Sequence, residues 1–439
     1  MGSHLSFPQF LYLSNSCRAI SMDAFLIRGG RPLKGRVKIR GAKNAVLPIM
    51  TASILADQPC VIENVPVLRD IVTMSKVLEH MGATVHDVGT GTLTVDCKLL
   101  KDHIAPYELV RTMRASVLVM GPLLAKLGKA KVALPGGCAI GLRPIDLHLK
   151  GIEALGASVK SGRGYVQVSA RKLHGAEICL DYASVGATEN LLMACVLAKG
   201  TSVIENAARE PEVQDLAKFL KALGAKITGE GTSRIVIEGV SGLGSATHCI
   251  IPDRIEAGTY LTAGAITNGR VTVDGVIEEH LGEFLKMLGD AGANIEANGP
   301  SITVSVPDGL KPVKIRTMPY PGFPTDMQAQ FMALMSVTPG ISSITETVFE
   351  NRFMQVAELN RMGANIRIER NTAIINGVSH LSGAEVMASD LRASAALVLA
   401  GLVSRGETKI SRIYHIDRGY DQIERRLKSL GADIRRVAD

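Results

Sequence analysis

The sequence predicts an α/β protein in which one unit of strands and helices, about 70 residues long, is repeated six times. Three observations lead to this fold class. The length of 439 residues exceeds one ordinary core and suggests two or three domains. Aromatic residues make up 4% of the chain, Trp is absent and glycine occurs 44 times, which favours aliphatic cores joined by many turns. A sequence phrase also recurs at even spacing.

The recurring phrase predicts a helix that passes into a strand. It consists of an apolar residue, two spacers, an apolar or small residue, Gly-Ala, a spacer and a β-branched residue. Glycine accepts positive φ at the end of a helix, and the following Val or Ile favours extended backbone. The six glycines, at intervals of 74, 68, 68, 71 and 68 residues, are Gly82, Gly156, Gly224, Gly292, Gly363 and Gly431.

The rest of the unit lies upstream of this phrase. A short β-branched run precedes several of the glycines by about eighteen residues, as in CVIENV and TSVIENA. Helices rich in Ala and Leu come before these runs, as in GATENLLMACVLAKG and LRASAALVLAGLVSRG. The unit is therefore predicted as strand, helix, strand, helix, strand, strand. Six units could form one ring or two groups of three, and the chain length favours two domains with a boundary near Pro252. We expect a site in the cleft between the two similar domains.

Charge and cysteine usage exclude several classes of protein. The 49 Lys and Arg against 42 Asp and Glu are spread along the chain with few aromatics, which argues against a nucleic-acid binder. Seven cysteines without a CxxC pair argue against a disulfide framework and a Cys-rich zinc site. We predict no metal and no cofactor. Reduced thiols are typical of a cytoplasmic protein, so we expect that location. No stretch of about 18 apolar residues is free of charged residues, so we expect neither a transmembrane helix nor a membrane partner.

The first 21 residues differ from the rest of the chain. MGSH resembles an expression-tag remnant, and the following apolar segment lacks the basic start of a good signal peptide. We therefore treat residues 1–21 as a leader or tag and expect the natural chain to begin at Met22.

The clearest departure from the repeat is the loop PGGCAIGLRP. Its glycines expose the backbone, and Cys138 lies near Arg143, whose positive charge favours a reactive thiolate. The alternative is an inert loop cysteine, which is the commoner case for an isolated thiol. The cysteines in apolar runs are predicted to be inert, and these are Cys60, Cys97, Cys179, Cys195 and Cys249.

Basic residues gather in two further segments. In IRGAKNAVLP, Lys43 and Asn44 begin an apolar helix, whose N-terminus and lysine predict an anion pocket; a solvated strand edge is the alternative. In YELVRTMRAS, Arg111 and Arg114 are predicted one turn apart on a helix, unless they extend along an apolar stripe to reach solvent.

Later segments supply an acid and more cations. In MPYPGFPTDMQAQF, Asp326 is either a helix N-cap, which its residue type favours, or a rigidly held carboxylate that takes a proton from a hydroxyl. DLRASAALVLAG carries Arg392 near a helix start, and RIYHIDRGYDQIE carries Arg418; ion pairing between repeats is the structural alternative. Together with the thiol, these groups suit a phosphorylated anionic substrate and proton transfer.

A set of motifs follows in order along the chain: GAKNA, TMRAS, LPGGCAIG with RPIDLH, SVGAT, ENAAREPE, PDRIE, FPTDMQAQ, ITETVFENRF, DLRASA and RIYHIDRGY. With these motifs the chain, from Met22 to its C-terminus, resembles the enolpyruvyl transferases that act on UDP-N-acetylglucosamine. The resemblance implies an inside-out α/β barrel of three repeats in each of two domains. The domains would be residues 43–251 and residues 22–42 plus 252–439, with the first strand crossing into the second.

The resemblance also implies a reaction and the residues that perform it. Enolpyruvyl would pass from phosphoenolpyruvate to the 3-hydroxyl of UDP-N-acetylglucosamine, with phosphate released by addition and elimination, in the first committed step of peptidoglycan precursor synthesis. Cys138 would be the acid, or the thiol that adds to phosphoenolpyruvate, and Asp326 would face the sugar hydroxyl. Lys43 and Arg418 are implied to share the catalysis. Phosphoenolpyruvate would contact Lys43, Asn44, Arg143, Arg392 and Arg418. UDP-N-acetylglucosamine would contact Asn44, Arg114, Arg143, Pro144, Ile145, Asp146, Leu147, Ser184, Val185, Gly186, Asp326 and Val348.

Two alternatives remain open at this point. A related transferase that acts on shikimate 3-phosphate shares the fold but lacks the cysteine loop, and a catalytically silent repeat scaffold or RNA binder belongs to another class. Leu142 replaces the small residue usual before the Arg-Pro of this loop. Members with Asp at the loop cysteine resist fosfomycin, so Cys138 implies sensitivity. We expect a monomer.

Overall fold

The computed structural model describes residues 23–110, 113–134 and 145–439, and of Arg114 the backbone alone. The strands in these segments form six four-stranded sheets. One unit illustrates all of them. β10 (Glu177–Cys179) runs parallel to β11 (Thr201–Glu205), β11 is antiparallel to β13 (Arg234–Glu238), and β12 (Lys226–Thr228) pairs with β13 at the edge. α6 (Val185–Cys195) and α7 (Pro211–Ala222) lie between these strands in the sequence, so the predicted order of the unit is confirmed.

The other five sheets have the same order of positions. They are β14 (Thr247–Cys249), β3 (Cys60–Glu63), β5 (Thr92–Asp96) and β4 (Thr84–His86); β6 (Ile104–Ala105), β7 (Lys129–Ala133), β9 (Tyr165–Ser169) and β8 (Ser158–Gly162); β2 (Lys34–Lys38), β15 (Arg270–Asp274), β17 (Ser301–Ser305) and β16 (Asn294–Asn298); β18 (Lys314–Arg316), β19 (Ile341–Thr345), β21 (Thr372–Asn376) and β20 (Asn365–Glu369); and β22 (Glu385–Met387), β23 (Glu407–Ser411), β1 (Asp23–Arg28) and β24 (Asp433–Ala438).

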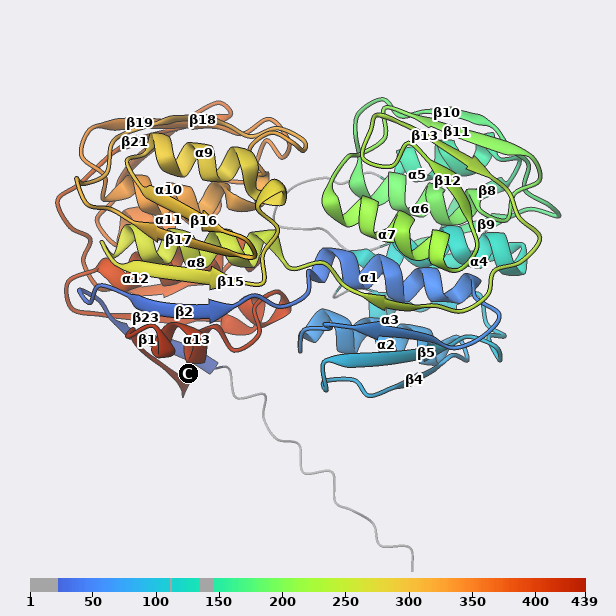
Figure 1. Ribbon diagram of the computed structural model, residues 1–439, viewed down its shortest axis with the longest axis horizontal. Helices are drawn as coiled ribbons and strands as arrows, with labels where there is room; N and C mark the ends of the chain where they lie inside the picture. Colours follow the sequence, from blue (N-terminus) through green and yellow to red (C-terminus); the bar gives the residue numbers. More distant parts are fainter. Residues whose placement is uncertain (1–22, 111–112, 135–144) are drawn as a thin grey trace, which may run out of the picture.

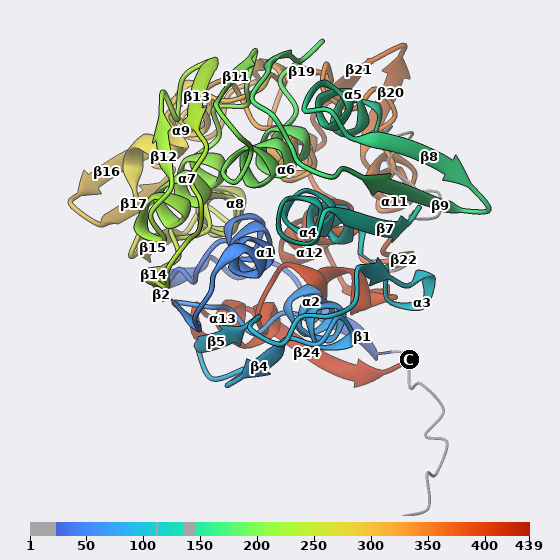
Figure 2. The same ribbon diagram turned by 90° about the vertical axis from the view of Figure 1, so that its right-hand side faces the viewer.

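The first long helix of each unit is a core helix. These helices are α1 (Lys43–Ala52), α4 (Met120–Leu127), α6, α8 (Arg254–Ile266), α10 (Gln328–Ser336) and α12 (Leu391–Val403). α6 is buried at every position from Ala187 to Cys195, as expected of a helix with packing partners on all sides. Figure 2 shows α1, α4 and α6 in the middle with sheets around them. The inside-out α/β arrangement is thereby confirmed. No described helix is long and apolar enough to cross a membrane.

The second helix of each unit ends at one of the recurring glycines. These helices are α2 (Arg69–His80), α5 (Asp146–Ala154), α7, α9 (Gly282–Asp290), α11 (Gln355–Arg361) and α13 (Ile423–Ser429). All six glycines have positive φ, between +91° and +109°, and each leads into the next strand. The repeat read from the sequence is therefore the physical repeat of the structure.

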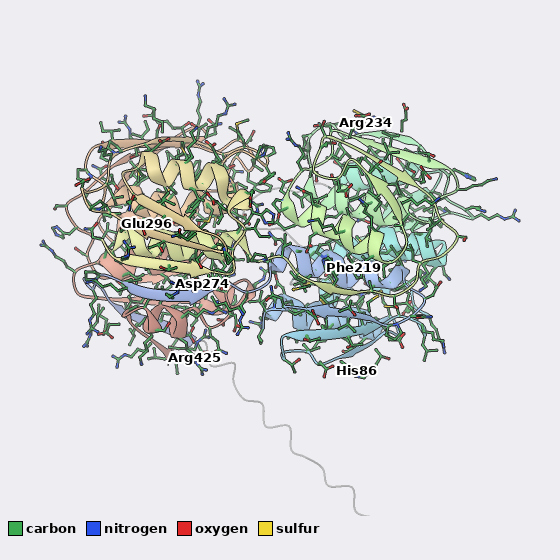
Figure 3. The ribbon with its side chains drawn as sticks, in the orientation of Figure 1. His86, Phe219, Arg234, Asp274, Glu296 and Arg425 are labelled. Atoms are coloured by element: carbon green, nitrogen blue, oxygen red, sulfur yellow. The ribbon has the colours of Figure 1, made fainter. Side chains whose placement is uncertain are left out.

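Two separate hydrophobic cores divide the molecule into two lobes (Figure 1). The first lobe is built on the core residues between Ala42 and Ile250. The second lobe combines core residues 25–39 with those from Ile255 to Ile434. Phe219 is fully buried in the first lobe, and in the second Asp274 binds Arg36 of β2 at 2.6 Å (Figure 3).

The chain crosses between the lobes twice, and the two crossings lie side by side. Gly41 and Pro252 form an antiparallel bridge. Ala42 N–H donates to Ile251 O at 2.8 Å, and Asp253 N–H donates to Arg40 O at 2.8 Å. A Cβ on Gly41 would lie 2.0 Å from Asn64 O, so only glycine fits at this crossing.

Candidate functional site

Lys43 is the first residue of α1 and follows the crossing directly. Its backbone N–H donates to Asp253 Oδ2 at 3.4 Å. Asp253 is the N-cap of α8, and its other oxygen accepts the N–H groups of Ile255 and Glu256 at 2.8 and 3.0 Å. One carboxylate therefore ties the start of α1 in the first lobe to the start of α8 in the second. The predicted helix start at Lys43 is confirmed.

The Lys43 ammonium group belongs to a buried cluster of three charges. Lys43 Nζ lies 3.4 Å from Asp70 Oδ2, and Arg418 Nε donates to Asp70 Oδ1 at 2.9 Å. Asp70 is in the first turn of α2, and Arg418 ends the 3-10 helix η5 (Ile413–Arg418). The structure thus brings Lys43 and Arg418, both predicted to bind an anion, onto one carboxylate.

The electrostatics of this cluster favour an anionic ligand. Burial lowers the pKa of Lys43. Asp70 partly opposes this shift, and the nearby cations Arg392 and Arg418 reinforce it. Two cations share one carboxylate in a poorly solvated place, so an added anion would gain favourable charge interactions.

Asp326 is held by two arginines. It lies in the 3-10 helix η4 (Thr325–Met327), where Oδ1 pairs with Arg352 Nη1 and Oδ2 with Arg392 Nη2, each at 2.7 Å. Both guanidinium groups are buried, with 6% and 5% of their side chains exposed. The N-cap interpretation of Asp326 is wrong, since Pro324 occupies the N-cap position and the carboxylate is turned to the arginines. The carboxylate is held rigidly instead.

These arginines also decide the protonation of Asp326. Burial alone would raise the pKa of Asp326, but Arg392 and Arg352 outweigh it and hold the pKa well below its ordinary value. Burial alone would lower the pKa of Arg392, and Asp326 reverses this effect, so that the pKa is raised. The acid is therefore ionised, and it is a weak base while both arginines contact it.

Tyr420 connects the two charged clusters. Its hydroxyl is within 2.8 Å of Thr259 Oγ1, 3.4 Å of Gln330 Nε2 and 3.4 Å of Arg392 Nη1. Burial raises the pKa of Tyr420, so the hydroxyl stays protonated. Because Tyr420 follows Arg418 by two residues, this contact places the Asp326 group next to the Lys43 group.

Glu346 organises the segment that carries Val348. It is fully buried and accepts hydrogen bonds from Thr317 Oγ1 at 2.6 Å and Thr325 Oγ1 at 2.8 Å. The same carboxylate accepts the N–H of Val348 at 2.8 Å and of Phe349 at 3.0 Å. Val348, predicted to contact the sugar, is thereby fixed near the turn of Asp326.

The predicted sugar residues of the first lobe gather at two helix starts. Ile145, Asp146 and Leu147 begin α5, and Asp146 is exposed. Ser184 is the N-cap of α6, where its hydroxyl accepts the Ala187 N–H at 3.4 Å, and Val185 and Gly186 follow. His148 of α5 links the two helices, because its Nδ1 lies 2.9 Å from Asn190 Nδ2 of α6. Burial lowers the pKa of His148 to about 4, so its ring is neutral.

The structure does not describe every residue that was predicted to belong to the site. Cys138, Arg143 and Pro144 lie outside the described residues, as do residues 1–21. Asn44 is exposed in the first turn of α1. The prediction of one continuous helix that carries Arg111 and Arg114 is wrong, because Met113 is extended with φ −142° before the 3-10 helix η2 (Arg114–Val119). Arg111 itself lies outside the described residues, and α3 (Tyr107–Val110) is described up to Val110.

The cysteines of the described residues are of two kinds. Cys60, Cys97 and Cys195 are buried, and burial raises the pKa of Cys97 and of Cys195 to about 12. Cys179 and Cys249, expected in apolar runs, are exposed on edge strands β10 and β14, because their side chains point away from the sheet's buried face. Within the described residues, no group of three or more His, Cys, Asp or Glu is arranged to hold a metal ion.

Sequence reasoning did not single out Asp70, Arg352 and Glu346. Asp70 lies in the first turn of an amphipathic helix, where an acid is common for local reasons, so it gave no signal. Arg352 and Glu346 lie in ITETVFENRF, a segment whose motif was recognised without a role for either residue.

Comparisons with known proteins give a consistent result. Residues 27–427 match the family model of EPSP synthase (3-phosphoshikimate 1-carboxyvinyltransferase). The chain is 56% identical over 416 residues to a UDP-N-acetylglucosamine 1-carboxyvinyltransferase of Desulfosudis oleivorans, covering 95% of this chain and 100% of that protein. The enolpyruvyl transferase NikO from Streptomyces tendae superposes with a TM-score of 0.87 at 26% identity, over 95% of this chain and 99% of NikO. An EPSP synthase from Acinetobacter baumannii shares the fold, with a TM-score of 0.74 at 18% identity over 95% of this chain and 100% of its own.

Proposed function

This chain belongs to the UDP-N-acetylglucosamine 1-carboxyvinyltransferases within the EPSP synthase family, and we propose that it transfers enolpyruvyl from phosphoenolpyruvate to the 3-hydroxyl of UDP-N-acetylglucosamine. The product is a precursor of peptidoglycan. The observation that carries the proposal is that Lys43 and Arg418 meet on Asp70 where the two lobes adjoin, and that Tyr420 connects this pair to the ion pair of Arg392 and Asp326.

The reaction needs an anion site, an acid and a base. Phosphoenolpyruvate carries a phosphate and a carboxylate, and positive charge for both is supplied by the largely buried Lys43 and Arg392 and by the partly exposed Arg418. One carbon of the enol must gain a proton while the sugar hydroxyl attacks its neighbour, so an acid and a base are required on opposite sides. We assign the acid, or the thiol that adds to phosphoenolpyruvate, to Cys138 and the group facing the hydroxyl to Asp326.

The arginine contacts of Asp326 set a condition for this role. The carboxylate is ionised, but two guanidinium groups 2.7 Å away reduce its basicity. A substrate carboxylate that draws Arg392 away from Asp326 would restore basicity in the ternary complex. Binding of phosphoenolpyruvate would then prepare Asp326 to accept a proton from the sugar hydroxyl.

The nucleotide sugar is proposed to lie across both lobes. The α5 and α6 starts of the first lobe would hold it together with Arg114, Arg143 and Pro144, while Asp326 and Val348 would contact it from the second. Asn44, exposed at the start of α1, would contact both substrates. Substrates held by two lobes are oriented toward each other, which lowers the barrier to reaction by several kcal/mol in general.

We further propose the domain boundaries and the cellular setting. Domains of residues 43–251 and of residues 22–42 plus 252–439 are supported by the two separate cores. A monomeric, cytoplasmic enzyme of cell-wall synthesis, needed for cell shape and division and inhibited by fosfomycin at Cys138, accords with the substrates.

Phosphate release tests the proposed reaction against its nearest rival. The family model is described by EPSP synthase, so shikimate 3-phosphate is the alternative acceptor. We expect phosphate release from phosphoenolpyruvate with UDP-N-acetylglucosamine and none with shikimate 3-phosphate. The reverse result would replace the proposed acceptor. Release with neither, together with salt-sensitive RNA binding, would favour the non-enzymatic class.

A further inference from the structure

Asp70 is a buried carboxylate that contacts two of the cations used in the proposed reaction. Its Oδ1 accepts from Arg418 Nε at 2.9 Å, and its Oδ2 accepts from Lys43 Nζ and Arg418 Nη2, each at 3.4 Å. The Asp70 side chain is 5% exposed, whereas that of Arg418 is 33% exposed. The carboxylate therefore lies on the inner side of the pair, and the guanidinium keeps an open side.

The three residues come from both lobes. Lys43 and Asp70 lie in the first turns of α1 and α2, next to the core of the first lobe. Arg418 ends η5 in the second lobe, and η5 packs against α2. Two cations that converge from different lobes repel each other in a poorly solvated place, and a carboxylate between them removes that cost.

Asp70 also supports the charge of Lys43. Burial lowers the pKa of Lys43, and Asp70 is the strongest of the influences that raise it. Cations on two neighbouring elements act in the opposite sense. The charged groups that face Lys43 are Asp70 of α2, Arg418 of η5, Arg392 of α12, Asp326 of η4 and Asp253 at the start of α8.

We propose that Asp70 is a positioning residue for the anion of phosphoenolpyruvate, an inference that rests on the proposed function. It holds the Lys43 ammonium and the Arg418 guanidinium together before substrate arrives. The phosphate or carboxylate of the substrate then meets an assembled pair on its open side. Charges that are already in place need no reorganisation when the substrate binds.

The variant Asp70→Asn keeps the shape of the side chain and removes its charge. We expect the KM for phosphoenolpyruvate to rise at least tenfold, with a smaller change in kcat. The decrease of kcat/KM at high pH, which forms the high-pH limb of the pH profile, begins at a lower pH in this variant. The reason is that Lys43 loses the carboxylate that favours its charged form. Asp70→Glu keeps the charge and returns this limb to its wild-type position. Glu79→Gln, at an exposed position of the same helix, removes one negative charge and changes neither quantity.

Calorimetric titration with inorganic phosphate, in the presence of UDP-N-acetylglucosamine, tests the same claim without turnover. We expect phosphate to bind Asp70→Asn at least tenfold more weakly than wild type. Equal or tighter binding, or a wild-type pH profile, overturns the proposal. If Asp70→Asn does not fold, Asp70→Glu decides: its longer side chain should raise the KM about threefold, and a wild-type KM overturns the proposal. A wild-type enzyme that binds phosphate but releases none from phosphoenolpyruvate contradicts the proposed function instead.

Discussion

At the scale of single residues, Asp326 combines two roles that place opposite demands on its basicity. It neutralises two buried guanidinium groups, and it is proposed to face the hydroxyl that reacts. In Asp326→Asn the amide keeps the shape but leaves Arg352 and Arg392 without a counter-charge. We expect kcat to fall roughly 100- to 10,000-fold. Loss of a buried ion pair should also lower the free energy of unfolding by about 3 kcal/mol.

The measurements for Asp326→Asn are steady-state kinetics, urea denaturation and calorimetric titration with UDP-N-acetylglucosamine. The nucleotide sugar should still bind, because most of its proposed contacts are elsewhere. Asp308→Asn, an exposed acid of the same lobe, should behave as wild type. Full activity in Asp326→Asn would remove Asp326 from the chemistry.

The cysteines allow a selective test of the proposed thiol. In the presence of UDP-N-acetylglucosamine, fosfomycin should modify Cys138 and leave Cys179 and Cys249 unmodified, although both are exposed. Exposure alone does not make a thiol reactive, whereas a neighbouring arginine favours the thiolate. Peptide mass spectrometry locates the adduct, and Cys138→Ala should lose it. An adduct at Cys179 or Cys249 in the wild type would show that accessibility, not activation, controls the reaction.

At the scale of elements, substitution of two of the recurring glycines by alanine distinguishes the free-energy cost of an unfavourable backbone φ from the cost of a steric clash. Gly156 and Gly292 have nearly equal φ, +92° and +94°. A Cβ on Gly156 meets nothing within 4 Å, whereas one on Gly292 would lie 2.7 Å from Gly309 O. We expect Gly156→Ala to cost about 1 kcal/mol for its backbone conformation. Gly292→Ala should cost clearly more, because backbone must also move. Urea denaturation measures both, and equal losses would contradict this account.

The elements also show how far local reasoning extends. The helix that starts at Lys43 and the six helix ends were predictable because they depend on neighbouring residues. The break at Met113 was not, since YELVRTMRAS reads as one helix and the extended backbone there depends on packing. The exposure of Cys179 and Cys249 likewise depends on which face of an edge strand the core covers.

At the scale of the whole molecule, buried acids lie where the lobes meet. Arg254 of the second lobe binds Glu212 of the first at 3.0 and 3.3 Å, and Tyr320 N–H donates to Glu210 Oε1 at 3.3 Å. Glu189 lies nearby in α6, and its Oε1 has no hydrogen-bond partner among the described residues. Burial raises the pKa of Glu189 well above its ordinary value, and Glu212 and Glu210 add to this effect.

A raised carboxyl pKa makes stability depend on pH with a definite sign. Below the unfolded-state pKa of about 4.5 Glu189 is neutral in both states, and stability is lost as the pH rises through the folded-state pKa. Glu189→Gln removes this loss, and each unit of pKa shift corresponds to about 1.4 kcal/mol. We expect the variant to gain at least about 1 kcal/mol over wild type at pH 8, with a smaller difference at pH 5.

Urea denaturation at both pH values provides the test of Glu189→Gln. Glu238→Gln, an exposed acid of the same lobe, should follow the wild-type pH dependence. A variant that is less stable than wild type at pH 8 would mean that Glu189 is ionised and paired in the folded protein.

The sequence by itself determined the repeat and the α/β class, and it supplied most of the residues that we propose for the chemistry. Glycine spacing, β-branched runs and loop motifs are local properties that each segment expresses alone. Only the tertiary structure decided how the charges combine. Lys43 and Arg418 meet on Asp70, which is 27 positions from one and 348 from the other, and Asp326 meets Arg392 across 66. Such pairings depend on how distant segments pack, within one lobe for Lys43–Asp70 and for Asp326–Arg392, and between the lobes for Arg418–Asp70. The physical reason is that folding takes these charges out of water, and the cost is offset only where packing brings a charge of opposite sign next to each of them.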